Sequence, residues 1–266
     1  MAKADIRRLK LWQGRIDTEV EISGSGAPLV YLHGPWGLGP DRGFAARLAE
    51  HYIVYAPKFP GTSEGNPDAV HALADWHDLV IYQDELLDAL DLKATAVAGH
   101  SFGGLLACEI AAAHPPRVTK LVLIDPVGLW RDDSPVKNWM IMSAAVRKTA
   151  LFADSNGAAA KAFFDVPADG DARVETLSQF IWAQACTGKF VWPIADRGLG
   201  QRIHRIAAPT LIVWGQSDGV IAPAYADEFA RRIASSRIAL IHNAAHMPHL
   251  EQGERVAGAV LDFLKV

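Results

Sequence analysis

The sequence predicts an α/β fold in which helices cover both faces of a mostly parallel central sheet. Short apolar runs alternate with segments of helical periodicity along most of the chain. Half of the 266 residues are hydrophobic, which is enough for a sizeable packed core. Residues 127–205 break the alternation and show only helical patterns. We therefore expect a core formed by residues 1–126 and 206–266, with a helical insertion at 127–205.

Three kinds of pattern predict the individual elements. Alternating apolar and polar residues predict a hairpin, and short apolar runs bounded by loop residues predict buried strands. Apolar residues spaced three or four apart predict helices, with Asp75 as a starting cap and Pro115-Pro116 as a stop. In chain order, the predicted core elements are a hairpin (9–12, 16–22), strands (28–32, 52–56), a helix (75–90), a strand (94–98), a helix (105–114), a strand (118–124), a strand (209–214), a helix (224–233), a strand (237–241) and a helix (256–264). The predicted helical pieces of the insertion are 138–152, 158–164 and 174–186.

Charge and cysteine usage narrow the class of protein. The net charge is −4 and no run of lysine and arginine occurs, so nucleic acid is not expected as a partner. No apolar run is long enough for a membrane span, and the first residues lack the apolar core of a signal peptide. Cys108 and Cys186 lie in helical patterns without metal-ligand spacing. We expect a cytoplasmic protein with no metal and no membrane partner; its oligomeric state stays open.

The stretch Gly99-His-Ser-Phe-Gly103 stands between a predicted strand and a predicted helix. This arrangement forces the serine into a tight bend, and the two glycines have no side chains to clash there. The hydroxyl of Ser101 is then presented at the carboxyl edge of the sheet. The N–H of Phe102 points to where a carbonyl oxygen would become negative, and the helix N-terminus favours that charge.

A serine hydroxyl needs a base, and the base needs a carboxylate that holds its tautomer. His246 follows the last predicted strand and would lie at the same sheet edge as Ser101. His249 stands where the final helix begins and is interpreted as a capping or structural group. Asp218, in the loop after the preceding strand, is the predicted carboxylate. Asp125, after the strand that follows the serine helix, is its competitor.

The order Ser101, Asp218, His246 on alternating strands and helices resembles the α/β-hydrolase fold over nearly the whole chain. The matching motifs are Gly99-His-Ser-Phe-Gly-Gly104 for the nucleophile elbow, Leu32-His-Gly34 for the oxyanion loop, Gly215-Gln-Ser-Asp218 for the acid loop and Ala245-His246 for the histidine loop. The resemblance implies covalent acyl-enzyme chemistry without a cofactor. It also implies that residues 127–205 form the family's variable helical lid.

Two positions depart from the family pattern. Pro35 follows the His-Gly pair, where relatives usually donate a backbone N–H to the oxyanion, and proline has none. The second donor beside Phe102 would then be Trp36 or Gly37. Lys58 stands where the family more often has an aspartate, and we interpret it as structural.

The predicted function is a serine hydrolase that cleaves carboxylic esters or lactones of small to medium apolar substrates. The residues expected to contact substrate are Trp36, Trp130, Trp139, Trp182 and Met247. One alternative is a carbon-carbon bond hydrolase of the meta-cleavage-product type, which an arginine facing Ser101 would support. Another is a receptor-like protein that keeps the fold but mainly binds a ligand.

Overall fold

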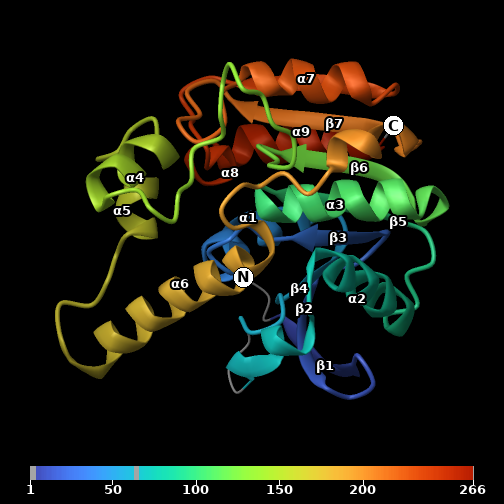
Figure 1. Ribbon diagram of the computed structural model, residues 1–266, viewed down its shortest axis with the longest axis horizontal. Coiled ribbons are helices and arrows are strands. Elements are labelled where there is room, and N and C mark those ends of the chain that lie inside the picture. Colours follow the sequence, from blue (N-terminus) through green and yellow to red (C-terminus); the bar gives the residue numbers. More distant parts are fainter. Residues whose placement is uncertain (1–3, 63–65, 266) are drawn as a thin grey trace.

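The computed structural model describes residues 4–62 and 66–265 and contains an eight-stranded sheet in the order β1-β2-β4-β3-β5-β6-β7-β8 (Figure 1). The strands are β1 (Asp5–Leu11), β2 (Ile16–Ser23), β3 (Pro28–Leu32), β4 (Ile53–Pro57), β5 (Thr95–His100), β6 (Val118–Ile124), β7 (Thr210–Gly215) and β8 (Ser236–Ile241). β2 pairs antiparallel with β1 and β4, whereas β3 to β8 pair in parallel. The predicted hairpin and mostly parallel sheet are confirmed.

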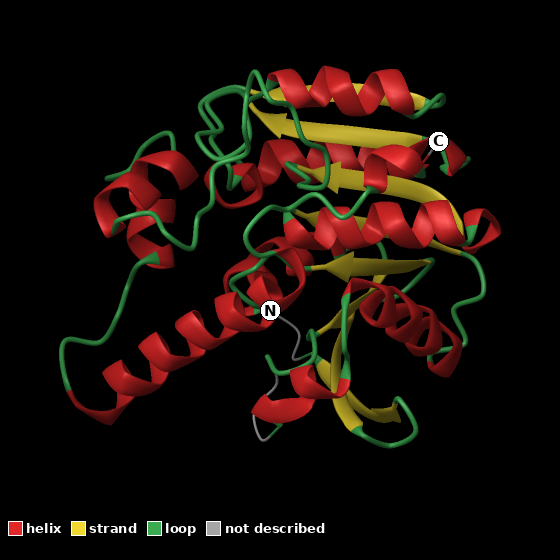
Figure 2. Ribbon diagram, viewed as in Figure 1, coloured by secondary structure: helices red, strands yellow, loops and turns green. Residues whose placement is uncertain are grey.

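Helices cover both faces of this sheet (Figures 1 and 2). The helices are α1 (Arg42–Leu48), α2 (Trp76–Ala89), α3 (Phe102–Ala113), α4 (Ala144–Leu151), α5 (Ala158–Phe163), α6 (Gly170–Val191), α7 (Ala224–Arg232), α8 (Pro248–Glu251) and α9 (Gly253–Lys265). Short 3-10 helices occupy Gly39–Asp41, Pro67–Ala72, Pro115–Arg117, Leu199–Gln201 and Ile203–Arg205. The predicted α/β fold is therefore correct.

The period of two along each strand divides the core into two layers. In β6, Leu121 and Leu123 pack into the layer that holds α2, α3 and α7. Val122 and Ile124 point the other way, into the layer that holds α1 and α9. Because β6 is covered on both faces, its sequence is almost continuously apolar rather than alternating.

The stretch 127–205 runs from β6 to β7 and contains α4, α5, α6 and two 3-10 helices, with no strand in this fully described range. Two boundaries differ from the prediction. The helix expected at 138–152 is shorter, because the Ser143 hydroxyl caps the N–H of Val146 and α4 begins only at Ala144. The helix expected at 174–186 is longer and extends over Gly170–Val191.

Parallel strands place their carboxyl ends at one edge of the sheet, and the loops that follow β3, β5, β6, β7 and β8 gather there. These loops contain every residue predicted to act in catalysis. Within the described ranges, no helix is both long and apolar enough to cross a membrane. Cys108 in α3 and Cys186 in α6 are buried free thiols.

Candidate active site

Ser101 lies in a strained turn between β5 and α3. Its φ of 51° and ψ of −111° place a non-glycine residue where the backbone rarely goes. The turn is so tight that it leaves no room for a side chain at either glycine. A Cβ at Gly99 would lie 2.3 Å from the Gly103 oxygen, and one at Gly103 only 2.1 Å from the Leu32 oxygen. The Ser101 N–H donates to the Ile124 carbonyl at 2.9 Å, which ties the bend to β6. The glycines of the motif thus permit a bend that neighbouring backbone holds in place.

The three predicted side chains form a continuous hydrogen-bonded chain. The Ser101 Oγ lies 3.0 Å from His246 Nε2, and His246 Nδ1 lies 2.8 Å from Asp218 Oδ2. A carboxylate only accepts, so the Nδ1–H of His246 donates to Asp218, and Nε2 is left to accept the Ser101 proton. The side chains of His246 and Asp218 have no exposed surface, and Ser101 is also buried. This is the geometry that activates a hydroxyl by general-base catalysis.

The two aspartates that competed in the sequence have different environments. Asp218 Oδ1 accepts from the N–H groups of Val220 and Ile221 at 2.8 and 2.9 Å, which stabilises its negative charge while Oδ2 faces His246. Asp125 Oδ1 accepts from the Gly215 N–H at 2.9 Å, and its Oδ2 has no hydrogen-bond partner. Burial, and then the neighbouring charge of Asp218, raise the pKa of Asp125 well above its ordinary value. The two carboxyl groups therefore differ: Asp218 faces His246, whereas the environment of the buried Asp125 favours its neutral form.

The two expected oxyanion donors are the N–H of Phe102, which follows Ser101, and the N–H of Trp36 in the loop after β3. Phe102 is the first residue of α3, so its N–H has no acceptor within the helix. Trp36 lies in the turn that starts at Pro35, and its ring centroid is 6.2 Å from that of His246. His33 holds this loop: its Nδ1–H donates to the Gly34 carbonyl at 2.7 Å, while Nε2 accepts from the backbone N–H that follows Lys58 at 3.3 Å.

Lys58 forms a partly buried ion pair with Glu19 at 2.7 Å, a contact across the sheet rather than toward Ser101. The side-chain hydrogen bond from Lys58 contributes most to lowering the pKa of Glu19. This arrangement agrees with the structural interpretation of Lys58.

Two of the predicted substrate-contacting tryptophans lie beside the triad. The Trp36 ring centroid is 6.4 Å from that of Trp139 and 5.6 Å from that of Phe163 in α5. Trp36 and Trp139 are 5% and 2% exposed, and Met247, next to His246, is fully buried. Phe163 was not predicted from the sequence to lie here. Trp36 of the core, with Trp139 and Phe163 of the insertion, forms an aromatic wall beside His246.

The other two predicted contacts lie elsewhere. The indole of Trp130 donates to Asp132, and Trp182 is 37% exposed on α6. Their part in a substrate pocket stays a prediction. A groove of about 1400 Å³ runs between α1, α5, α8 and α9 and reaches Phe163 and His249, yet no triad residue lines it. Ser101 is thus enclosed in this conformation.

Two groups of described residues bring together three side chains of metal-ligating types within 4.8 Å: Asp125, Asp218 and His246, and Asp41, His100 and His249. Each group contains an aspartate–histidine pair already joined by a direct hydrogen bond, at 2.8 and 3.0 Å. In each group the aspartate and histidine of that pair bond one another, whereas Asp125 Oδ2 and the Nδ1 atoms of His100 and His249 have no hydrogen-bond partner. The second group was not predicted from sequence, although His249 was interpreted as structural.

Comparisons with known proteins agree with this geometry. The family model described as "Alpha/beta hydrolase family" matches residues 29–259, so the chain belongs to the alpha/beta hydrolase family. It is 30% identical over 253 residues to a pimeloyl-acyl-carrier-protein methyl ester esterase of Aromatoleum aromaticum, covering 89% of this chain and 98% of that protein. It is 26% identical over 287 residues to a 2-hydroxy-6-oxo-2,4-heptadienoate hydrolase of Pseudomonas putida, covering 98% and 97%.

The fold is also shared with solved structures. Naproxen esterase from Bacillus subtilis superposes with a TM-score of 0.76 at 18% sequence identity, covering 98% of this chain and 92% of that one. At this identity the likeness shows the fold alone. The curated relatives include proteins named as a methyl ester esterase, a diacylglycerol lipase and a 2-hydroxy-6-oxo-2,4-heptadienoate hydrolase, so the family is fixed while the substrate is not.

Proposed function

We propose that this member of the alpha/beta hydrolase family cleaves carboxylic esters or lactones of small to medium apolar substrates through a serine acyl-enzyme. The observation that carries the proposal is the contact of the Ser101 Oγ with His246 Nε2 at 3.0 Å, in a turn that strains the serine backbone to a φ of 51°. Similarity to a methyl ester esterase supports ester cleavage in particular.

The proposed reaction uses each group in turn. Ser101 Oγ bonds to the ester carbonyl carbon as its proton passes to His246 Nε2, and Asp218 stabilises the imidazolium. The N–H groups of Phe102 and Trp36 stabilise the oxyanion. When the tetrahedral intermediate collapses, His246 gives its proton to the leaving alkoxide. Water then attacks the acyl-enzyme as its proton passes to His246, and the acid leaves with Ser101 restored.

We also propose that residues 127–205 act as a lid over the core formed by 1–126 and 206–266. The support is burial: Ser101 and His246 are fully buried, and Trp139 of the insertion packs near Trp36. An ester can reach Ser101 only if this cover moves, as lids do in many enzymes. The wall of Trp36, Trp139 and Phe163 makes the enclosed site apolar, which favours uncharged substrates. The cytoplasmic location stays a prediction.

A carbon-carbon bond hydrolase is the second candidate, because the Pseudomonas putida relative has that kind of name and matches over 98% of this chain. An arginine facing Ser101 would favour it. Instead, Arg131 pairs with Asp133, and Arg147 donates to the Met142 carbonyl. These contacts weigh toward the ester reaction.

The test compares two serine variants on a panel of p-nitrophenyl esters of graded acyl length, beside a vinylogous 1,5-diketo acid. Ser101→Ala is expected to lower ester hydrolysis by about 10,000-fold or more while the protein stays folded. Ser235→Ala, an exposed serine in the loop before β8, serves as the matched control. Normal ester hydrolysis by folded Ser101→Ala would reject the mechanism, and turnover of the diketo acid alone would favour the second candidate.

A further inference from the structure

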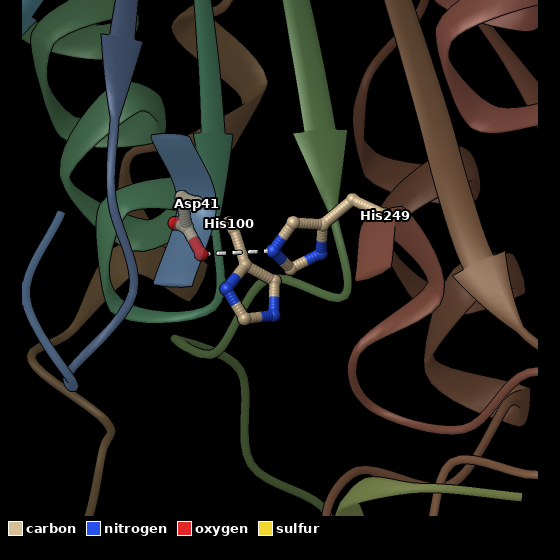
Figure 3. A group of neighbouring side chains, drawn as sticks. All are labelled: Asp41, His100 and His249. Carbon is tan, nitrogen blue, oxygen red and sulfur yellow. Dashed lines mark hydrogen bonds and ion pairs between the residues drawn. The ribbon is translucent and has the colours of Figure 1, made fainter. Parts of the chain in front are cut away.

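A second cluster of buried histidines and carboxylate lies beside the triad and has no step in the mechanism above (Figure 3). Asp41 ends the 3-10 helix in the loop after β3, His100 is the last residue of β5, and His249 lies in α8. All three are at least 98% buried, with exposures of 2%, 0% and 2%. The cluster therefore joins the oxyanion loop, the serine turn and the histidine loop, which are far apart in the sequence.

Asp41 is the anchor of this cluster. Its Oδ1 accepts from His249 Nε2 at 3.0 Å, the dashed contact in Figure 3. Its Oδ2 accepts from the Tyr31 hydroxyl at 3.0 Å and from the Gly34 N–H at 3.4 Å. One carboxylate thus fixes both the oxyanion loop and α8, which begins two residues after His246.

His100 makes the contact that reaches the triad. Its Nε2 lies 2.9 Å from the backbone carbonyl oxygen of His246. A carbonyl only accepts, so His100 carries a proton on Nε2 and donates it. The His249 ring also packs against the His100 ring, with centroids 4.3 Å apart. At Gly34, an added Cβ would lie 2.6 Å from His100 Nδ1, so the oxyanion loop also limits how the His100 ring can turn.

We propose that His100 is a positioning residue for His246: its Nε2–H holds the His246 backbone so that the imidazole stays within reach of Ser101, and the Asp41–His249 pair holds the His100 ring in place. His100 precedes Ser101 in the chain. His100, next to Ser101, therefore holds the backbone of His246 by a direct hydrogen bond. This contact helps to fix the distance between the Ser101 hydroxyl and the His246 imidazole. This inference rests on the proposed function.

Removing the donor would leave a buried carbonyl without its partner, and the His246 loop would shift to reach another. Misplacement of a catalytic group by about 1 Å can cost about 100-fold in rate. The His100 ring stacks on that of Trp36, with centroids 6.4 Å apart, and leucine or glutamine at position 100 still fills that place, so we expect the aromatic wall and substrate binding to change little. The expected signature is therefore a fall in kcat with little change in KM.

The experiment uses His100→Leu and His100→Gln as a matched pair. Leucine removes the donor, whereas the glutamine amide can place an N–H near the former Nε2 position. With p-nitrophenyl esters, His100→Leu is expected to lower kcat by about 10- to 100-fold with KM nearly unchanged. His100→Gln is expected to regain most of the lost kcat. Val260→Ala, a buried α9 residue in the layer of α1 and α9, controls for destabilisation alone and should leave kcat unchanged.

A fluorophosphonate that labels activated serines separates the two proposals, because its reaction needs no ester substrate. An unlabelled wild-type protein would overturn the proposed function and this inference with it. A labelled wild-type protein and a folded His100→Leu variant that reacts equally fast would overturn the positioning role alone. If His100→Leu does not fold, His249→Leu and His249→Gln give the same comparison one contact further away, and equal labelling of all three folded proteins would reject the proposal.

Discussion

Asp218 and Asp125 lie at the ends of neighbouring strands, and changing each to asparagine should give opposite results. Asp218 Oδ2 lies 2.8 Å from His246 Nδ1, whereas the Asp125 side chain accepts from the Gly215 N–H at 2.9 Å and does not reach His246 by a hydrogen bond. Burial and the charge of Asp218 raise the pKa of Asp125 well above its usual range, which favours the neutral form of its carboxyl group. One substitution removes the carboxylate that orients His246 in the proposed mechanism, and the other replaces a carboxyl group whose neutral form is favoured by a neutral amide.

In Asp218→Asn, the amide oxygen can still accept from the Val220 and Ile221 N–H groups, now 2.8 and 2.9 Å from Oδ1. The NH₂ group then faces His246 Nδ1 and donates to it. His246 must carry its proton on Nε2, where it cannot accept the proton of Ser101. The same change of tautomer in serine proteases lowers kcat by about 10,000-fold, which corresponds to about 5 kcal/mol of transition-state stabilisation.

In Asp125→Asn, the amide oxygen can keep the bond from the Gly215 N–H, and the NH₂ group can donate toward Asp218. The shape of the site is preserved, and its charge changes little because the raised pKa of Asp125 favours the neutral carboxyl group. We expect kcat to fall by less than about tenfold, or about 1.4 kcal/mol. The two variants should therefore differ by about three orders of magnitude or more in kcat.

The assay is the initial rate of p-nitrophenyl ester hydrolysis near pH 8, with thermal melting to show that both variants fold. An active Asp218→Asn beside an inactive, folded Asp125→Asn would refute this reasoning and assign the orienting role to Asp125. Equal losses in both would show that the two carboxyl groups act as one unit.

Two further predictions concern stability. Gly103→Ala should lower the free energy of unfolding by about 1 to 3 kcal/mol, because its Cβ would lie 2.1 Å from the Leu32 oxygen. Gly258→Ala in α9 should instead raise the free energy of unfolding by about 0.5 to 1 kcal/mol, because a Cβ there meets nothing within 4 Å. Urea unfolding of both variants checks this, and two equal shifts would contradict it. For Asp41, burial raises the pKa, but the neighbouring histidines, led by His249, together outweigh burial and lower the pKa from 3.8 to about 2. Because its pKa is lowered, Asp41 stabilises the fold above pH 4, and this stabilisation is lost as the pH falls toward 2. Asp41→Asn should therefore lose about 2 kcal/mol of unfolding free energy at neutral pH. Its unfolding free energy should also depend less on pH between pH 4 and pH 2. Unchanged acid unfolding of Asp41→Asn would contradict the prediction.

The contacts among Ser101, Asp218 and His246 could be predicted from the sequence because each residue follows a predicted strand. Ser101, Asp218 and His246 are each bounded by turn residues, and parallel strands bring such loops to one edge whatever the details of packing. The order of the three along the chain then matched a known fold. Their mutual contacts required no knowledge of the insertion.

Helix ends and short helices were harder to predict, for local reasons. α1 has only seven residues, too few turns to show a period, and the side chain of its N-cap residue, Asp41, makes no capping hydrogen bond. α6 extends from Gly170, beyond the apolar pattern, and its first residues are exposed. Such segments form because the rest of the fold holds them, and that support cannot be read from the segment itself.

The cluster of Asp41, His100 and His249 could not have been predicted from the sequence. Asp41 and His249 are 208 residues apart, and neither lies in a motif that requires the other. His100 stood inside the serine motif, but a residue between glycine and serine gives no indication of which loop its side chain will contact. Only the folded backbone shows that it reaches the carbonyl of His246.

In the proposed mechanism, the burial of the triad makes turnover depend on movement of the insertion. The hydrogen bonds from Ser101 to Asp218 are formed while both partners of His246 are buried, so the reacting groups are aligned before substrate arrives. Exclusion of water strengthens these bonds, but it also excludes the ester. The insertion carries several exposed apolar side chains, namely Ile141, Val146, Val174, Ile181, Trp182, Trp192 and Ile194. A segment that leaves so much apolar surface in water is less firmly packed than the core, which makes it, in the proposed mechanism, the part that moves while the core keeps the triad aligned.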